Sequence, residues 1–144
     1  MPKLGNIVFY ADDPATLARF WSEVFGYPPV TWEGPLVDEL RASGLTQADL
    51  DSRAMAEDPE GKGPRFFFHH AGGPKAGRNR IHIDVTVTSK TGAGRATPEE
   101  LDAEKDRLVD LGAGVVRLVE QTWGPWPERY WQMQDPEGNE FCLQ

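Results

Sequence analysis

The stretch DPEGNEFCL, Asp135–Leu143, combines a turn signal with a run of strand-forming residues. Proline presets the backbone at the second turn position and glycine tolerates its left-handed end, so DPEG predicts a tight turn. The same four letters stand 77 residues earlier, at Asp58–Gly61, and another strand-like run, Arg65–His70, follows them. The chain therefore contains two copies of one turn-and-strand unit.

A second pair of similar segments supports this duplication. Leu4–Tyr10 and Ile81–Val87 both alternate apolar and polar residues, as half-buried strands do, and each precedes a helical pattern. Aligning these segments sets Asn6 against His82 at an offset of 76 residues. Two offsets that agree to one residue predict a repeated supersecondary unit, and neither copy is expected to close a core alone.

Each half of the chain has the pattern of a strand, a helix and three further strands. The first half predicts, after Leu4–Tyr10, a helix at Asp13–Phe25, a short strand at Val30–Trp32, an inserted helix at Pro35–Gly44, and strands at Ser52–Glu57 and Arg65–His70. The second half predicts, after Ile81–Val87, a helix at Pro98–Leu111 and strands at Val115–Glu120, Arg129–Gln134 and Glu140–Leu143, with the segment TWGPWPE (Thr122–Glu128) as a loop. The predicted fold class is α+β, built from two tandem βαβββ modules.

Composition limits the organisation and the partners of the chain. With 144 residues and 39% hydrophobic letters, we expect one domain over residues 1–144, with modules at about 1–72 and 78–144 joined by the Gly/Pro-rich connector Ala71–Asn79. The net charge of −8 argues against nucleic acid and anionic membranes as partners. The lack of a long apolar span and the single cysteine, Cys142, are typical of a soluble, cytoplasmic protein.

The two modules resemble the vicinal oxygen chelate superfamily, with NRIHIDV (Asn79–Val85) opening the second module and DPEGNEFCL closing it. This superfamily includes glyoxalase I, bleomycin-resistance proteins and extradiol dioxygenases. More narrowly, the chain resembles the glyoxalase-like domain group over essentially its whole length. The resemblance implies that the sheets curve into an open, barrel-like wall around a cleft. It also implies a homodimer, an expectation that the five tryptophans of so small a chain support.

The resemblance further implies a divalent metal held by side chains from the first and last strands of each module. Those positions fall on Asn6, Phe67, His82 and Cys142, and only His82 keeps the side chain that the family uses. A cysteine and a histidine can bind zinc together, but protein zinc sites recruit three or four ligands and a third is not evident. We therefore expect no cofactor. If zinc, nickel, manganese or iron does bind, its expected ligands are His82 and Cys142.

Strand alternation places a mixed set of side chains on one concave face. The candidates for proton transfer are His82, Asp84, Tyr10 and His69, because histidine titrates near neutral pH. For His82 the alternative is a structural histidine bonded to Asp84 or Asn6. Trp123 and Trp126 either form the wall of a ligand pocket or cover a barrel edge or a subunit interface. The predicted ligand-binding set is Asn6, Tyr10, Phe67, His69, His82, Asp84, Cys142, Trp123 and Trp126.

Three functions are compatible with these residues. The first is a metal-free protein that binds a small hydrophobic or cationic molecule in its cleft, as the resistance proteins of the superfamily do. The second is a lyase, isomerase or dioxygenase that depends on a divalent metal; His82 favours it, whereas Asn6 and Cys142 argue against it. The third is a non-catalytic interaction module. Whether the protein is an enzyme stays open at the level of sequence, because one fold hosts many chemistries.

Overall fold

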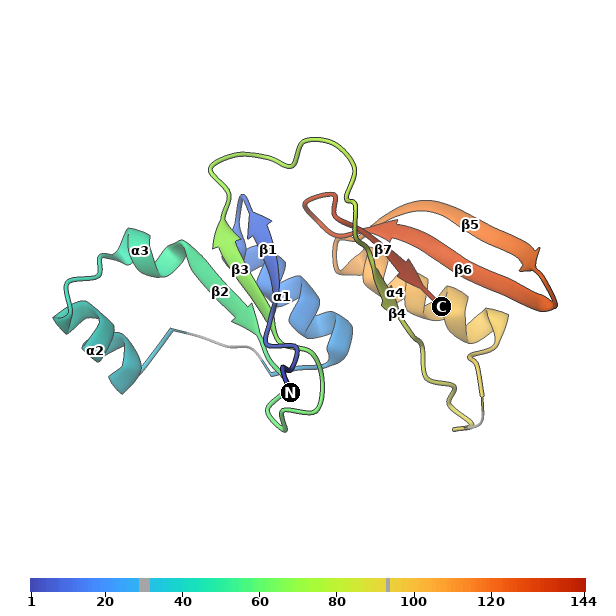
Figure 1. Ribbon diagram of the computed structural model, residues 1–144, viewed down its shortest axis with the longest axis horizontal. Coiled ribbons are helices and arrows are strands. Elements are labelled where there is room, and N and C mark those ends of the chain that lie inside the picture. Colours follow the sequence, from blue (N-terminus) through green and yellow to red (C-terminus); the bar gives the residue numbers. More distant parts are fainter. Residues whose placement is uncertain (29–31, 93) are drawn as a thin grey trace. The chain divides into compact units, whose positions relative to one another are not determined.

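The computed structural model describes residues 1–28, 32–92 and 94–144. The chain divides into two compact units, Met1–Pro74 and Lys75–Gln144, so their boundary lies in the connector Ala71–Asn79. Each unit carries one mixed sheet and its own helices, which makes the fold α+β (Figure 1). None of the helices in the described ranges has both the length and the apolar character needed to cross a bilayer.

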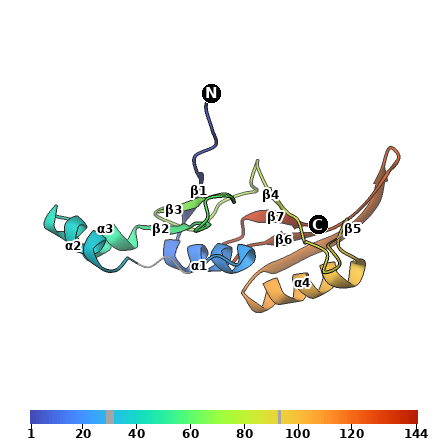
Figure 2. The same ribbon diagram turned by 90° about the horizontal axis from the view of Figure 1, so that it is seen from below.

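Unit 1 contains a three-stranded sheet in the order β1-β3-β2. Its strands are β1 (Ile7–Ala11), β2 (Arg53–Ala56) and β3 (Phe66–His70). Strand β3 runs parallel to β1 and antiparallel to β2. Helix α1 (Pro14–Phe25) lies along one face of this sheet (Figure 2).

The ends and the buried face of α1 follow from its sequence. Asp13 caps its start by accepting a hydrogen bond from the backbone N–H of Thr16 at 3.1 Å, and Gly26 ends it in the left-handed conformation that glycine favours. Its apolar stripe includes Trp21, whose ring stacks on that of Phe66 with centroids 5.4 Å apart. Both side chains are buried, so the aromatic stripe of α1 forms the core of unit 1.

Two short helices connect α1 to β2. Helix α2 (Pro35–Ala42) is the predicted inserted helix, whereas α3 (Gln47–Asp51) was not predicted. The sequence signal for α3 is a capping box, in which Thr46 and Asp49 exchange backbone-to-side-chain hydrogen bonds. The short strand predicted at Val30–Trp32 lies mostly outside the described residues.

Unit 2 contains a four-stranded sheet in the order β4-β7-β6-β5. Its strands are β4 (Ile83–Val85), β5 (Gly114–Trp123), β6 (Trp126–Gln134) and β7 (Glu140–Leu143). Strand β4 is parallel to β7, and the other neighbouring pairs are antiparallel. Helix α4 (Pro98–Asp110) begins at the predicted capping box of Thr97 and Glu100 and lies along one face of the sheet (Figure 2).

The prediction of a loop at Thr122–Glu128 is wrong. Strands β5 and β6 continue through it to the directly opposed pair Trp123 and Trp126, so only Gly124 and Pro125 form the turn. Gly124 has a φ of 59°, which glycine adopts without strain. The two indoles stack with centroids 5.5 Å apart, and this cross-strand contact holds the hairpin together where proline and glycine suggested a break.

The duplication is visible in how the strands of each unit pair. In unit 1, β1 pairs with β3 in a register that sets Ile7 opposite Phe66. In unit 2, β4 pairs with β7 in a register that sets Ile83 opposite Phe141. Asn6 directly precedes β1 and His82 directly precedes β4, so the two residues hold equivalent positions, as predicted.

The two DPEG turns have the same internal geometry. In each, the backbone N–H of the glycine donates to the aspartate carbonyl, at 3.0 Å for Gly61 and 2.9 Å for Gly138. The aspartate side chain then accepts from the backbone N–H two residues later, at 2.9 Å in Asp58 and 3.0 Å in Asp135. Repeated sequence thus gives repeated structure, because these contacts lie within the motif itself.

Candidate functional site

A row of polar side chains crosses the sheet of unit 2. The strand register places Asp84 of β4 opposite Cys142 of β7, and Cys142 opposite Gln132 of β6. Arg117 of β5 extends the row, since it lies opposite Gln132 and donates from Nε to its Oε1 at 2.8 Å. Residues directly opposite each other in a sheet share a face, so four polar side chains project from the same side.

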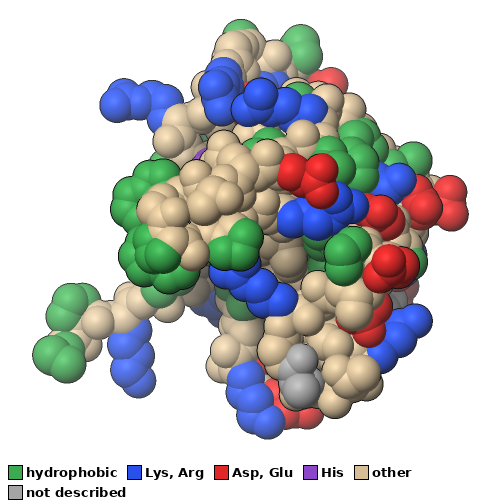
Figure 3. All heavy atoms as spheres, turned by 90° about the vertical axis from the view of Figure 1, so that its right-hand side faces the viewer, with side chains coloured by type: hydrophobic (Ala, Val, Ile, Leu, Met, Phe, Trp, Pro, Cys, Tyr) green, Lys and Arg blue, Asp and Glu red, His purple; other side chains and the backbone are tan. Residues whose placement is uncertain are grey.

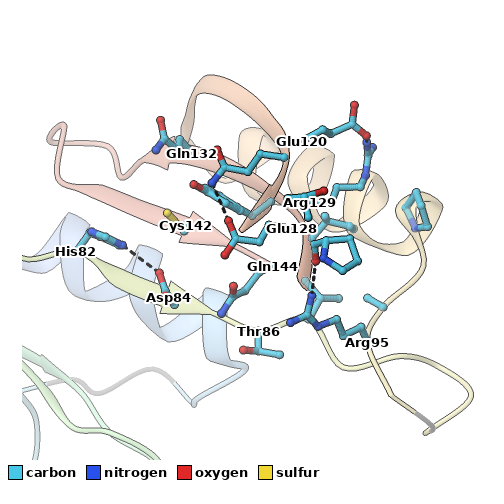
Figure 4. A pocket seen from close by; sticks show the side chains of 18 residues that line it. His82, Asp84, Thr86, Arg95, Glu120, Glu128, Arg129, Gln132, Cys142 and Gln144 are labelled. Atoms are coloured by element: carbon cyan, nitrogen blue, oxygen red, sulfur yellow. Dashed lines mark hydrogen bonds and ion pairs between the residues drawn. The ribbon is translucent and has the colours of Figure 1, made fainter. Parts of the chain in front are cut away.

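His82 belongs to the same face because it is two residues before Asp84 on an extended segment. Its Nε2 lies 3.2 Å from Asp84 Oδ1, and Figure 4 shows the imidazole pointing at the carboxylate. Both side chains are more than half exposed, at 56% and 52%, so this contact contributes little to stability. The contact with Asp84 instead fixes the orientation of the His82 imidazole beside β7.

Cys142 lies at the buried end of this cluster. Its exposed fraction is 8%, and burial raises the pKa of its thiol to about 11, with a further contribution from the negative charge and hydrogen bond of Asp84. The thiol of the metal-free protein is therefore neutral at physiological pH. A neutral thiol is a poor nucleophile, so the arrangement does not favour nucleophilic catalysis by Cys142.

His82, Asp84 and Cys142 form a group of potential metal ligands. One donor atom from each lies within 4.8 Å of the other two. His82 and Cys142 are the two ligands expected from the sequence, and the structure adds the carboxylate of Asp84 as a third donor. A nitrogen, a sulfur and an oxygen fit a zinc-like cation, whereas magnesium and calcium require oxygen ligands almost throughout.

A cavity of about 1010 Å³ opens over this face of unit 2. His82, Asp84 and Cys142 line one part of it, and Figure 4 shows Arg95 in a different part. Apolar contact area comes from residues such as Leu101 and Tyr130. The other polar and charged lining residues are Thr86, Glu120, Gln121, Thr122, Arg129, Gln132 and Gln144.

The charged groups of the pocket are mostly paired with one another. The guanidinium of Arg129 contacts both carboxylate oxygens of Asp102 at 3.2 Å and also pairs with Glu120. Gln121 donates to Glu128 at 2.7 Å, and Arg95 donates to the carbonyl of Pro127 at 3.3 Å. Acidic and basic side chains are likewise interspersed on the face of the molecule in Figure 3. The pocket is therefore polar without a single dominant charge.

A family model described as the glyoxalase-like domain matches residues 6–144. The chain belongs to this family. Its membership agrees with the duplicated units and with the fold of solved relatives in the glyoxalase, bleomycin-resistance and dioxygenase group. A search of curated protein sequences found no match.

Solved structures similar to this glyoxalase-like protein share its fold at low sequence identity. The fosfomycin resistance protein FosX from Mesorhizobium loti is 17% identical, with a TM-score of 0.62 over 100% of this chain and 91% of its own. FosX from Listeria monocytogenes is 15% identical, with a TM-score of 0.62 over 99% and 92%. A glyoxalase-related enzyme from Fulvimarina pelagi is 16% identical, with a TM-score of 0.61 over 99% and 87%.

The other site residues predicted for this glyoxalase-like protein belong to unit 1 or to the β5–β6 hairpin. Tyr10, Phe67 and His69 share a face of the unit 1 sheet, with the His69 ring 5.1 Å from Phe67 and 6.2 Å from Tyr10. Asn6 precedes that sheet and accepts from Arg65 Nε at 2.5 Å. Trp123 and Trp126 are at the tip of the β5–β6 hairpin and do not line the pocket of unit 2.

Sequence reasoning missed most of the pocket wall in this glyoxalase-like protein. Glu128, Tyr130 and Gln132 recur at every second residue of β6, and this alternation was the signal that could have identified them. Arg95 carried no such signal, because it lies in a loop before α4.

Proposed function

We propose that this glyoxalase-like protein binds a small organic molecule in the pocket of unit 2. The observation that carries the proposal is the cavity of about 1010 Å³ with His82, Asp84 and Cys142 in its lining. Small-molecule sites are typically concavities of about 300–1,000 Å³ in which a few polar groups orient a ligand against apolar walls.

The lining residues indicate the kind of ligand. Asp84 and Glu128 offer carboxylate oxygens that can accept from an N–H-donating group of the ligand, whether neutral or cationic, in a chain of net charge −8. Tyr130 and Leu101 supply aromatic and aliphatic contact. A resistance-like or sequestering role is compatible with this fold, whose solved examples include proteins named for fosfomycin resistance.

A second candidate is a metal-dependent lyase, isomerase or dioxygenase, favoured by the convergence of three donor atoms within 4.8 Å. His82, Asp84 and Cys142 would hold the ion, which when bound supplies Lewis-acid polarisation of a ligand oxygen. The role of the protein chain is then to present these donors and to orient the ligand through the pocket wall. The first candidate needs no metal, so ligand binding in excess chelator distinguishes the first candidate from the second.

The test is a thermal-shift screen of aromatic and cationic small molecules in excess chelator, with calorimetric titration of each hit. His82→Ala should weaken binding by about 0.5–1.5 kcal/mol, the net scale of one hydrogen bond. The matched control is His70→Ala, which removes an exposed histidine of unit 1. A hit that binds wild type and both variants equally would contradict the proposed site. A hit that binds only when a metal is supplied would favour the second candidate.

A further inference from the structure

We propose that unit 1 contains a second ligand site, a pocket between α1, α3 and β2 that binds a small organic cation with an apolar body. The site is a cavity of about 580 Å³, which we call the unit 1 pocket. Its described lining residues all belong to unit 1, so the proposal goes beyond the function proposed for the pocket of unit 2.

The flank of α1 that faces this cavity carries three small side chains. Ala15, Ala18 and Ser22 follow one another at intervals of three and four residues, so they share one side of the helix. The largest apolar side chain of α1, Trp21, is buried in the core of unit 1 instead. The small side chains therefore leave room beside β2 for another molecule.

Residues on either side of the inserted segment form the walls of the unit 1 pocket. Trp32 is held against β2, because its indole N–H donates to the carbonyl of Arg53 at 2.8 Å. Leu50 of α3 and Ala54 of β2 are 4% and 9% exposed and line the cavity as well. An aromatic ring beside buried aliphatic groups provides the apolar contact area that an organic ligand needs.

Ser22 offers a polar contact inside the cavity. It is 4% exposed and lines the unit 1 pocket. None of the hydrogen bonds found among the described residues involves its hydroxyl. Buried hydroxyls generally have a hydrogen-bond partner, and the oxygen of Ser22 can accept from an N–H group of a ligand.

The charges around the cavity favour a cation. Carboxylates outnumber guanidiniums among the lining residues, which include Asp13, Glu23, Glu33, Asp51, Arg19 and Arg53. Hydrogen bonds from Thr16 lower the pKa of Asp13, so this carboxyl is ionised at neutral pH. A positive group over the indole of Trp32 would gain a further attraction to the ring. The chemistry that fits is an ammonium group on an aromatic or aliphatic body.

The experiment is an NMR titration of isotope-labelled protein with phenethylammonium and, in parallel, with the uncharged phenethyl alcohol. The chain has five tryptophans, so Trp32→Phe assigns the indole signal of Trp32. We expect the ammonium to shift this signal and the backbone N–H signal of Ser22 along one saturating curve. The alcohol should bind several-fold more weakly, because it has the same body without the charge.

Two variants test the unit 1 pocket itself. Ser22→Ala should weaken phenethylammonium binding by about two- to tenfold, the scale of one hydrogen bond. Ala15→Leu places a larger side chain at an exposed position in the lining and should weaken binding at least as much. Its matched control is Ala103→Leu at an exposed position of α4, which should leave the affinity unchanged. His82→Ala should also leave it unchanged, because His82 lines the pocket of unit 2.

Circular dichroism of each variant separates loss of the site from loss of the fold. The proposal is overturned if millimolar phenethylammonium shifts neither signal, or if the alcohol binds as tightly as the ammonium. It is also overturned if Ser22→Ala or Ala15→Leu binds as wild type does, or if His82→Ala abolishes binding. None of these outcomes removes the organic-ligand site proposed in unit 2, which is tested there by its own screen.

Discussion

Asp84 and Cys142 lie directly opposite each other on the parallel strands β4 and β7, which places an exposed carboxylate beside a buried thiol. Burial first, and then the charge and hydrogen bond of Asp84, raise the pKa of that thiol to about 11 from an ordinary value of 9.0. A group that loses its proton more easily in the unfolded chain makes stability depend on pH.

The first prediction is a loss of stability at alkaline pH that depends on Cys142. The folded protein holds the thiol proton more tightly than the unfolded chain does. The stability that the protonated thiol contributes is therefore fully present below pH 9 and is lost as the pH rises towards 11. The loss is at most about 3 kcal/mol. Urea unfolding of chelator-treated protein between pH 7 and 11 measures it. Cys142→Ala should show a shallower decline, and an identical decline would contradict the assignment.

The second prediction compares the two DPEG turns. Asp135 is 3% exposed, and its side chain accepts hydrogen bonds from Glu137 and from both the backbone and side-chain nitrogens of Asn139. Asp135→Ala should cost about 2–4 kcal/mol, because buried donors lose a charged partner. Asp58→Ala removes the equivalent contacts at a more exposed turn and should cost less. If both variants shift the urea midpoint equally, the deeper burial of Asp135 does not make its turn contribute more to stability than that of Asp58.

A third prediction concerns the pH dependence of Asp58. Hydrogen bonds from the backbone N–H groups of Glu60 and Gly63 lower the pKa of its carboxyl. Such a group stabilises the fold above its unfolded pKa, and the contribution disappears as the pH falls through the lower folded value. NMR titration of the Asp58 carboxyl should therefore give a pKa below 3.8. Asp58→Asn should destabilise the protein less at pH 2 than at pH 7.

The fourth prediction separates the two faces of β3. Phe66 is fully buried against Trp21 and Phe25, whereas its neighbour Phe67 points to the opposite face and is half-buried. Phe66→Ala should destabilise the protein by about 3–5 kcal/mol, the cost of an aromatic cavity in a core. Phe67→Ala should cost clearly less. Chemical unfolding of the two variants provides the comparison, and a larger loss for Phe67 would mean that its face is covered in solution.

The homodimer expected from the family resemblance stays a proposal, and the mass in solution tests it directly. Trp123 and Trp126, 66% and 57% exposed at the hairpin tip, are large apolar groups of the kind that association covers. Light scattering should give twice the monomer mass of 16.1 kDa. A mass of one chain would contradict the proposal.

Local signals in the sequence were sufficient to predict most of the fold. The DPEG turns, the cap of α1 at Asp13 and the capping box at Thr97 all predicted their elements, because each depends on contacts among residues a few positions apart. The same reasoning failed at Thr122–Glu128, where proline and glycine suggested a loop. There the pairing of β5 with β6 and the stacked indoles outweighed local preference.

The sequence by itself predicted a duplicated α+β chain in which His82 matches Asn6, and the family resemblance implied that His82 alone keeps a usual metal ligand. Only the tertiary structure decided that Asp84 completes a three-donor group with His82 and Cys142, and that Glu128 and Arg95 line the same cavity. The physical reason is strand register. Alternation tells which face a side chain occupies, but the pairing of β4 with β7 sets which residues lie opposite each other across 58 positions of sequence, from Asp84 to Cys142.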